Sequence, residues 1–134
     1  MNSAIEWHDS YLIEVAQIPA RDGEIVMDAY VHRSDGKPGE TPGEGGYQRI
    51  RIALSSMQFE DVVPELPADI YEGVLLLGGA VYNDLVPLPM RFEGDASLAL
   101  TLRSDAQSLT FSGTGIRIEP VGDFRFVEKV DFTE

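Results

Sequence analysis

The sequence predicts an all-β protein: an antiparallel meander of about eight or nine strands that forms a sandwich or a barrel. Segments in which apolar and polar residues alternate follow one another along almost the whole chain. Gly, Pro and Asp turn residues separate them, and the connections leave no room for crossover helices. The 134 residues form a single domain, 1–134, large enough for one hydrophobic core. Alternation alone leaves both sandwich and barrel open.

The first two predicted strands form a β-hairpin. Residues 11–15 and 25–32 alternate, and the Pro, Asp and Gly of residues 19–23 supply the turn. The second strand has an apolar row at Ile25, Met27, Ala29 and Val31. Its opposite row is Asp28, Tyr30 and His32, which is typical of a solvent-facing strand.

A glycine-rich segment separates this hairpin from the third predicted strand. Residues 34–46 hold five glycines and two prolines, which predicts a flexible loop and no strand. Residues 47–58 then alternate, with an apolar row at Ile50, Ile52 and Leu54. Arg49 and Arg51 lie on the other face, where we expect them to pair with neighbouring carboxylates.

Prolines limit the helical character of the next segment. Apolar residues recur at helix-like intervals over residues 59–71, but Pro64 and Pro67 allow at most one short helical turn near 60–72, or an irregular crossover. Residues 74–82 follow as a strand predicted to be buried on both faces. The Gly78-Gly79 pair within it marks a bulge or a sharp bend.

Five further apolar rows alternate through the second half of the chain. Their ranges are 88–92, 98–102, 109–111, 116–118 and 124–132. The turns expected between them lie at residues 93–95, 104–106, 112–115 and 121–123. Such short connections favour antiparallel neighbours.

Composition excludes several classes of protein. The chain has no cysteine, so it has no disulfide framework and no thiolate chemistry. Its first residues lack the basic and apolar regions of a secretory signal, which predicts a cytoplasmic protein. The apolar run at residues 74–81 is far shorter than the roughly 20 residues of a membrane helix, so no membrane span is expected.

Negative charge is the strongest global feature of the sequence. The net charge is −13, and residues 52–90 contain no Lys or Arg. This surface repels nucleic acid and would attract a basic protein partner. The partner-binding region nominated by this asymmetry comprises Glu60, Asp61, Glu65 and Asp69. The alternative is that the charge only keeps the protein soluble.

No motif has the spacing of a catalytic, metal or cofactor site. His8, Asp9 and Ser10 are residue types of a catalytic triad, but consecutive residues of a strand point in opposite directions. We expect Asp9 or Ser10 to bond to nearby backbone and Trp7 to plug one end of the core. With two histidines and no cysteine, no metal site is nominated. The sequence therefore predicts no enzyme, no catalytic residue and no cofactor.

Glu128 is a local anomaly because it interrupts an apolar row. Phe124, Phe126, Val130 and Phe132 have the same parity, which predicts that Glu128 faces the core. An inward carboxylate lies at a strand end, has a structural partner, or is functional. We hypothesise that it bonds to residues 7–9 or to an arginine.

These residues also carry a resemblance. Trp7-His8-Asp9-Ser10 followed by Leu12, the step at residues 59–62, and Phe126-Val127-Glu128 after a Gly-Asp turn resemble a loose group of small bacterial proteins of unknown function. The group shares an early hydrophobic-His-Asp-small signature, and some members are classed as immunity proteins. The resemblance implies an intracellular β-rich protein without established enzymatic activity. It also implies that His8, Asp9 and Glu128 match the group's recurrent polar residues, whereas residues 34–46 depart from its compact pattern.

Two function classes remain. The first is a non-enzymatic binding protein, immunity-like, whose acidic surface docks a basic partner. The second is a sandwich or barrel that binds a small ligand in a pocket near Trp7, His8 and Glu128. An apolar cavity of several hundred Å³ would favour the second class, and a filled core with an exposed acidic patch would favour the first.

Overall fold

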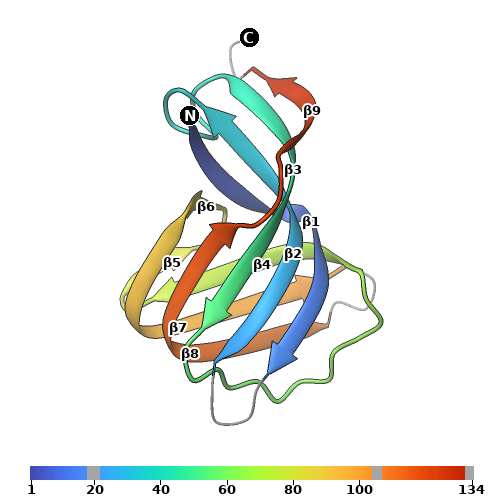
Figure 1. The fold of residues 1–134 in the computed structure, drawn as a ribbon, viewed down its shortest axis with the longest axis vertical. Helices are drawn as coiled ribbons and strands as arrows, with labels where there is room; N and C mark the ends of the chain where they lie inside the picture. The colour runs from blue at the N-terminus through green and yellow to red at the C-terminus, as the bar shows by residue number, and fades with distance from the viewer. Residues whose placement is uncertain (18–21, 104–106, 132–134) are drawn as a thin grey trace.

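The computed structural model describes residues 1–17, 22–103 and 107–131, which form one antiparallel sheet of nine strands with no helix in these ranges (Figure 1). The strands are β1 (Asn2–Gln17), β2 (Gly23–Ser34), β3 (Gly43–Leu54), β4 (Ala68–Leu77), β5 (Ala80–Tyr82), β6 (Leu85–Leu88), β7 (Met90–Leu102), β8 (Ser108–Pro120) and β9 (Arg125–Val130). The predicted all-β class is confirmed.

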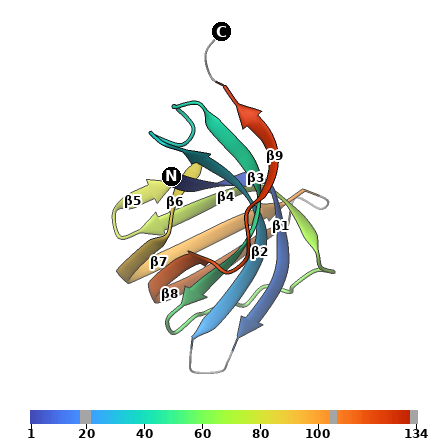
Figure 2. The ribbon, with the colours of Figure 1, turned by 45° about the horizontal axis from the view of Figure 1, so that its top comes forward.

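Six of these strands close into a barrel, which decides between the two predicted architectures. The neighbours are β1, β2, β3, β8, β7 and β4, and β4 returns to β1 through Tyr11 opposite Asp69 and Leu12 opposite Ala68. In Figures 1 and 2, β1, β2 and β3 form one wall, and β4 crosses it at a steep angle together with the paired parts of β7 and β8. β8 then bends, and its end, residues 116–120, runs beside β3. β5 and β6 extend the two ends of the sheet, and β9 pairs with β3 beyond the barrel.

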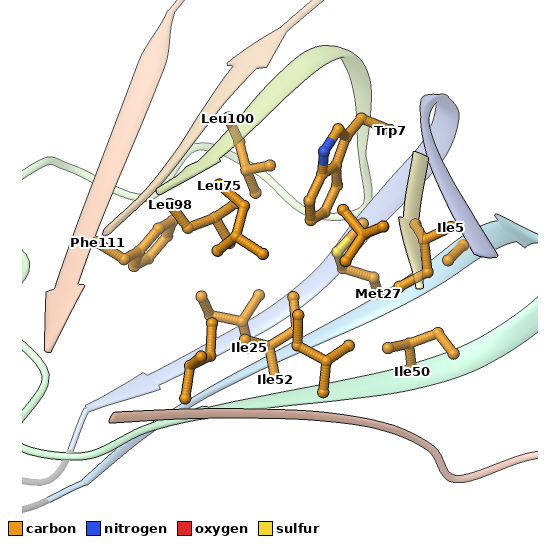
Figure 3. Packing of buried hydrophobic residues seen from close by; sticks show 14 of the residues in the cluster. Ile5, Trp7, Ile25, Met27, Ile50, Ile52, Leu75, Leu98, Leu100 and Phe111 are labelled. Atoms are coloured by element: carbon orange, nitrogen blue, oxygen red, sulfur yellow. The ribbon is translucent and has the colours of Figure 1, made fainter. Parts of the chain in front are cut away.

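The inner rows of the two walls fill the barrel with side chains (Figure 3). Ile25, Met27, Ile50 and Ile52 are fully buried, as the alternation predicts. Trp7 is also buried and packs over Gly73, where an added Cβ would lie 2.7 Å from the indole Cγ. The expectation that this tryptophan belongs to the core is confirmed.

The predicted loop at residues 34–46 is shorter than expected. β2 continues to Ser34 and β3 begins at Gly43, so only residues 35–42 connect them, and the expectation of no strand over residues 43–46 is wrong. Glycines serve close approach here: a Cβ at Gly43 would lie 2.0 Å from the Arg33 carbonyl oxygen, and one at Gly45 would lie 2.2 Å from the Tyr30 hydroxyl.

The segment between β3 and β4 is the irregular crossover allowed by its prolines. It covers the edge of β8 that β3 leaves unpaired, because Gln58 and Ser112 exchange backbone hydrogen bonds of 2.8 and 3.1 Å. Farther along, the Asp61 carboxylate accepts a 2.8 Å hydrogen bond from the Thr110 amide. This carboxylate therefore takes the place of a ladder carbonyl.

Three predicted boundaries differ from the structure. The segment at residues 74–82 is a hairpin of β4 and β5 turned by Gly78-Gly79, and Leu76 is 41% exposed, so it is not buried on both faces. Residues 93–95 and 112–115 are no turns: β7 and β8 run through them with a register shift between Glu93 and Ala96. The turns expected at 19–23 and 104–106, and Phe132, lie partly or wholly outside the described residues.

Candidate functional site

β1 bulges away from β2 at residues 7–10. Glu6 pairs with Tyr30 and Tyr11 pairs with Asp28, so residues 7–10 of β1 face a single residue of β2. The buried Ser10 hydroxyl donates to the Glu6 carbonyl at 2.6 Å and accepts from the Tyr30 amide at 2.9 Å. The predicted local role of Ser10 is confirmed, and it repairs the ladder where the strand bulges.

This bulge places the side chains of His8 and Asp9 on the outside of the barrel. Asp9 has a φ of 70°, a left-handed conformation that aspartate tolerates better than most residues. His8 Nδ1 lies 3.2 Å from Asp9 Oδ2, and Arg103 Nη2 lies 3.3 Å from His8 Nε2 and 3.7 Å from Asp9 Oδ1. The Tyr71 ring lies 6.0 Å from the imidazole, edge to face.

This surface cluster has the character of a structural contact. With Nε2 of His8 accepting from Arg103, the ring proton is on Nδ1 and faces Asp9. Both ring nitrogens are thus engaged. A general base needs a free nitrogen beside a nucleophile, and the hydroxyl nearest in sequence, Ser10, is buried and bonded to backbone.

Glu128 does not face the core, and the prediction of its inward position is wrong. In the β3–β9 ladder Gly45 pairs with Glu128 and Gly46 pairs with Phe126, so Val127 is an extra residue that reverses the alternation. Glu128 is exposed, and its Oε1 accepts a 2.7 Å hydrogen bond from the Tyr30 hydroxyl. Its partner is neither an arginine nor residues 7–9 in the described contacts.

The outer row of β2 is more covered than a solvent-facing strand. Tyr30 is only 8% exposed, and its ring packs edge to face against His32 and Tyr47, with centroids 5.2 and 5.5 Å apart. Burial raises the pKa of the Tyr30 phenol well above its usual range, and the hydrogen bond to Glu128 adds to this. The phenol is therefore a neutral donor that helps to hold β9 on the barrel.

A second contact between β2 and β9 is ionic. Arg125 hydrogen-bonds to the Asp28 carboxylate, which also lies 3.9 Å from Arg49.

Another ion pair joins β3 to β8. Arg51 bonds to Glu119 at 2.5 Å, and this hydrogen bond lowers the pKa of the Glu119 carboxyl. The prediction that Arg49 and Arg51 pair with carboxylates is confirmed.

The nominated acidic region contains two kinds of carboxylate. Glu60, Glu65 and Asp69 are exposed on the crossover and on β4. Asp61 is also exposed, but it caps the Thr110 amide as described above. Three of the four nominated residues are therefore available to a partner without loss of a contact that the described residues make.

A groove lies away from the predicted pocket residues. It has a volume of about 700 Å³ and is lined by the start of β1, the β2–β3 connection and β6, with apolar side chains from Met1, Pro38, Leu85 and Leu88. Trp7, His8 and Glu128 do not line it, so the structure does not bring these three residues together around this groove. The part of the chain that is described holds no group of three or more His, Asp or Glu suited to a metal ion.

Comparison with known proteins assigns this chain to no family. Neither the models of protein families, nor the curated proteins, nor the solved structures contain a match to this chain. Within the described ranges, no helix is long and apolar enough to cross a membrane.

Proposed function

We propose that this chain is a non-enzymatic, immunity-like binding protein of the bacterial cytoplasm whose acidic outer surface docks a basic protein partner. The observation that carries the proposal is a barrel filled with apolar side chains beneath exposed, cation-poor carboxylates. A filled barrel leaves binding to the outer surface. Glu60, Glu65 and Asp69 project there from a stretch, residues 52–90, without a single Lys or Arg.

Charge complementarity gives this surface a physical means of recruitment. Carboxylates of one sign raise the rate at which a positively charged partner arrives, and salt screens that attraction over about 8 Å at physiological ionic strength. A basic partner is therefore expected to associate more slowly as salt rises. If the charge served only solubility, removing these carboxylates would change binding no more than removing others elsewhere on the surface.

The test compares two variants of equal net charge. The patch variant is E60Q/E65Q/D69N, and the control variant is E14Q/E93Q/D95N, which neutralises exposed carboxylates elsewhere. Each changes the charge from −13 by three, to −10. Asp61 stays intact because it bonds to the Thr110 amide.

Each protein is immobilised and used to capture proteins from native lysate at low and high salt, with quantification by mass spectrometry. We expect the wild type and the control variant to retain the same basic protein at low salt, and the patch variant to lose it. Equal retention by the patch and control variants contradicts the proposal, as does the absence of any enriched basic protein.

A second candidate function is the binding of a small apolar ligand, which the groove of about 700 Å³ supports because its volume is typical of ligand sites. Leu85 lines this groove, and Leu76, exposed on β4, does not. A neutral apolar dye should therefore lose its fluorescence gain with Leu85→Gln and keep it with Leu76→Gln. Equal fluorescence of the two variants contradicts this candidate.

A further inference from the structure

The protein holds two of its own arginines with the same pair of groups, an aromatic ring and a carboxylate. The Arg33 guanidinium carbon lies 4.3 Å from the centroid of the Phe124 ring, and Nη1 lies 3.7 Å from Glu44. The Arg103 guanidinium carbon lies 5.7 Å from the Tyr71 centroid, and Nη2 lies 3.7 Å from Asp9. A guanidinium gains from both groups, because the ring face and the carboxylate each attract its charge.

A third aromatic and carboxylate pair has no cation. Tyr11 of β1 and Asp69 of β4 are opposite residues in the short ladder that closes the barrel. Their neighbours Leu12 and Ile70 are fully buried, so Tyr11 and Asp69 project outward together. Opposite side chains of antiparallel strands begin about 5 Å apart. The Tyr11 ring also packs against Tyr47, with ring centroids 6.0 Å apart, so one side of the ring is already covered.

Tyr47 lies on the β2–β3 side of the Tyr11 ring, and Asp69 lies on the β4 side. On β2, the other residue opposite Tyr11 is Asp28, and that carboxylate is already paired with Arg49 and Arg125. No ion pair found among the described residues includes Asp69. Arg103 is close in the fold, because its amide donates to the Asp69 carbonyl at 2.9 Å, but its guanidinium lies against Asp9 and over Tyr71.

Tyr11 and Asp69 are exposed enough to contact another molecule. Tyr11 is 37% exposed and Tyr71, two residues beyond Asp69 on β4, is 49% exposed. Tyrosine is enriched at the centres of protein interfaces because its ring buries a large apolar area with little loss of conformational freedom. Carboxylates beside it select for a positively charged side chain.

We propose that Tyr11 and Asp69 form a binding site for the guanidinium group of an arginine on the basic partner. The inference deepens the proposed function and rests on it for the existence of that partner. It assigns the centre of the docking surface to the seam between β1 and β4, with Glu60 and Glu65 acting at longer range.

The site is tested with an isolated arginine side chain. The ¹⁵N-labelled protein is titrated with Nα-acetyl-arginine methylamide, and in parallel with the citrulline analogue, which has nearly the same shape and no charge. We expect saturable amide shifts that gather at Tyr11, Asp69 and their strand neighbours, at least fivefold larger with arginine. Equal shifts with citrulline, or shifts that gather elsewhere, overturn the proposal.

Variants separate the two groups of the site. Asp69→Asn and Tyr11→Leu should each reduce the arginine-dependent shifts by more than half, while Asp95→Asn, an exposed carboxylate on β7, should leave them unchanged. Amide spectra of the free variants report whether each one folds. Undiminished shifts in folded Asp69→Asn overturn the proposal even if Tyr11→Leu does not fold.

Failure here is distinct from failure of the proposed function, because Tyr11→Leu leaves the net charge unchanged. If capture of the basic partner is lost with E60Q/E65Q/D69N but retained by Tyr11→Leu, the arginine site is wrong and acidic docking stands. If both variants lose the partner and the arginine shifts map to Tyr11 and Asp69, both proposals are supported.

Discussion

The hydrogen bond from Tyr30 to Glu128 tests how β9 is held on the barrel. Tyr30→Phe removes one oxygen and leaves the buried ring in place. A hydrogen bond to a charged acceptor contributes about 1.5–3 kcal/mol when both groups are buried. Because Glu128 is exposed, solvent screening lowers this, and we expect a loss of about 1 kcal/mol in the free energy of unfolding.

Urea unfolding at pH 7 measures this loss. With a slope of about 1.5 kcal/mol per molar urea, a loss of about 1 kcal/mol lowers the midpoint by about 0.7 M. Tyr71→Phe is the matched control, because Tyr71 is half exposed, and we expect less than about 0.2 M. A double-mutant cycle with Glu128→Gln measures the pair itself. Coupling below about 0.3 kcal/mol would refute the view that this bond fastens β9.

The burial of the Tyr30 phenol predicts that stability depends on pH. In the folded protein the pKa of Tyr30 is raised above its ordinary value of 10.0, chiefly by burial. The folded state therefore holds this proton more tightly than the unfolded state, and the resulting stability is complete below pH 10 and is lost as the pH rises above it. The stability difference between wild type and Tyr30→Phe should shrink between pH 9 and pH 11. A constant difference contradicts this assignment.

Two further predictions concern the barrel and its crossover. Gly73→Ala should lower the free energy of unfolding by about 1–3 kcal/mol, measured by thermal or urea unfolding, because the new Cβ meets the buried Trp7 indole. Gly79→Ala is the control, and because Gly79 has open space around it we expect a change within about 0.5 kcal/mol. Equal effects of the two variants contradict this packing. Asp61→Ala should lower stability by about 1–2 kcal/mol by leaving the Thr110 amide without its acceptor, while Glu60→Gln should be silent; a silent Asp61→Ala contradicts the capping role.

Alternation predicted β2 and β3, two neighbouring strands of one wall, well because their inner rows are completely buried. Ile25 and Met27 on β2, and Ile50 and Ile52 on β3, need only the period of an extended strand to be placed correctly. Closure into a barrel had no such local signal. It depends on the pairing of Tyr11 and Leu12 with residues more than fifty positions away, and two residues of ladder leave no pattern in either segment.

The glycines of residues 43–46 show a limit of composition as a guide. Glycine is frequent in loops because it adopts many backbone conformations, and a run of glycines therefore predicts a loop. In β3 the missing side chains do something else, since they let the Arg33 carbonyl and the Tyr30 hydroxyl approach the strand. From the sequence alone, these two uses of glycine are the same.

Bulges explain why the faces of the candidate site residues were harder to predict than those of the core. An odd number of extra residues reverses the alternation of the residues that follow. There is one at Val127 in β9, there are three within residues 7–10 in β1, and there is one between Ile70 and Glu72 in β4. The first turns Glu128 toward Tyr30. The other two flank the ladder of Tyr11 and Asp69, where they bring a buried tryptophan and exposed polar groups within a few residues of one another. A strand that follows the period of two presents one polar and one apolar face, so an unusual surface arises where that period fails.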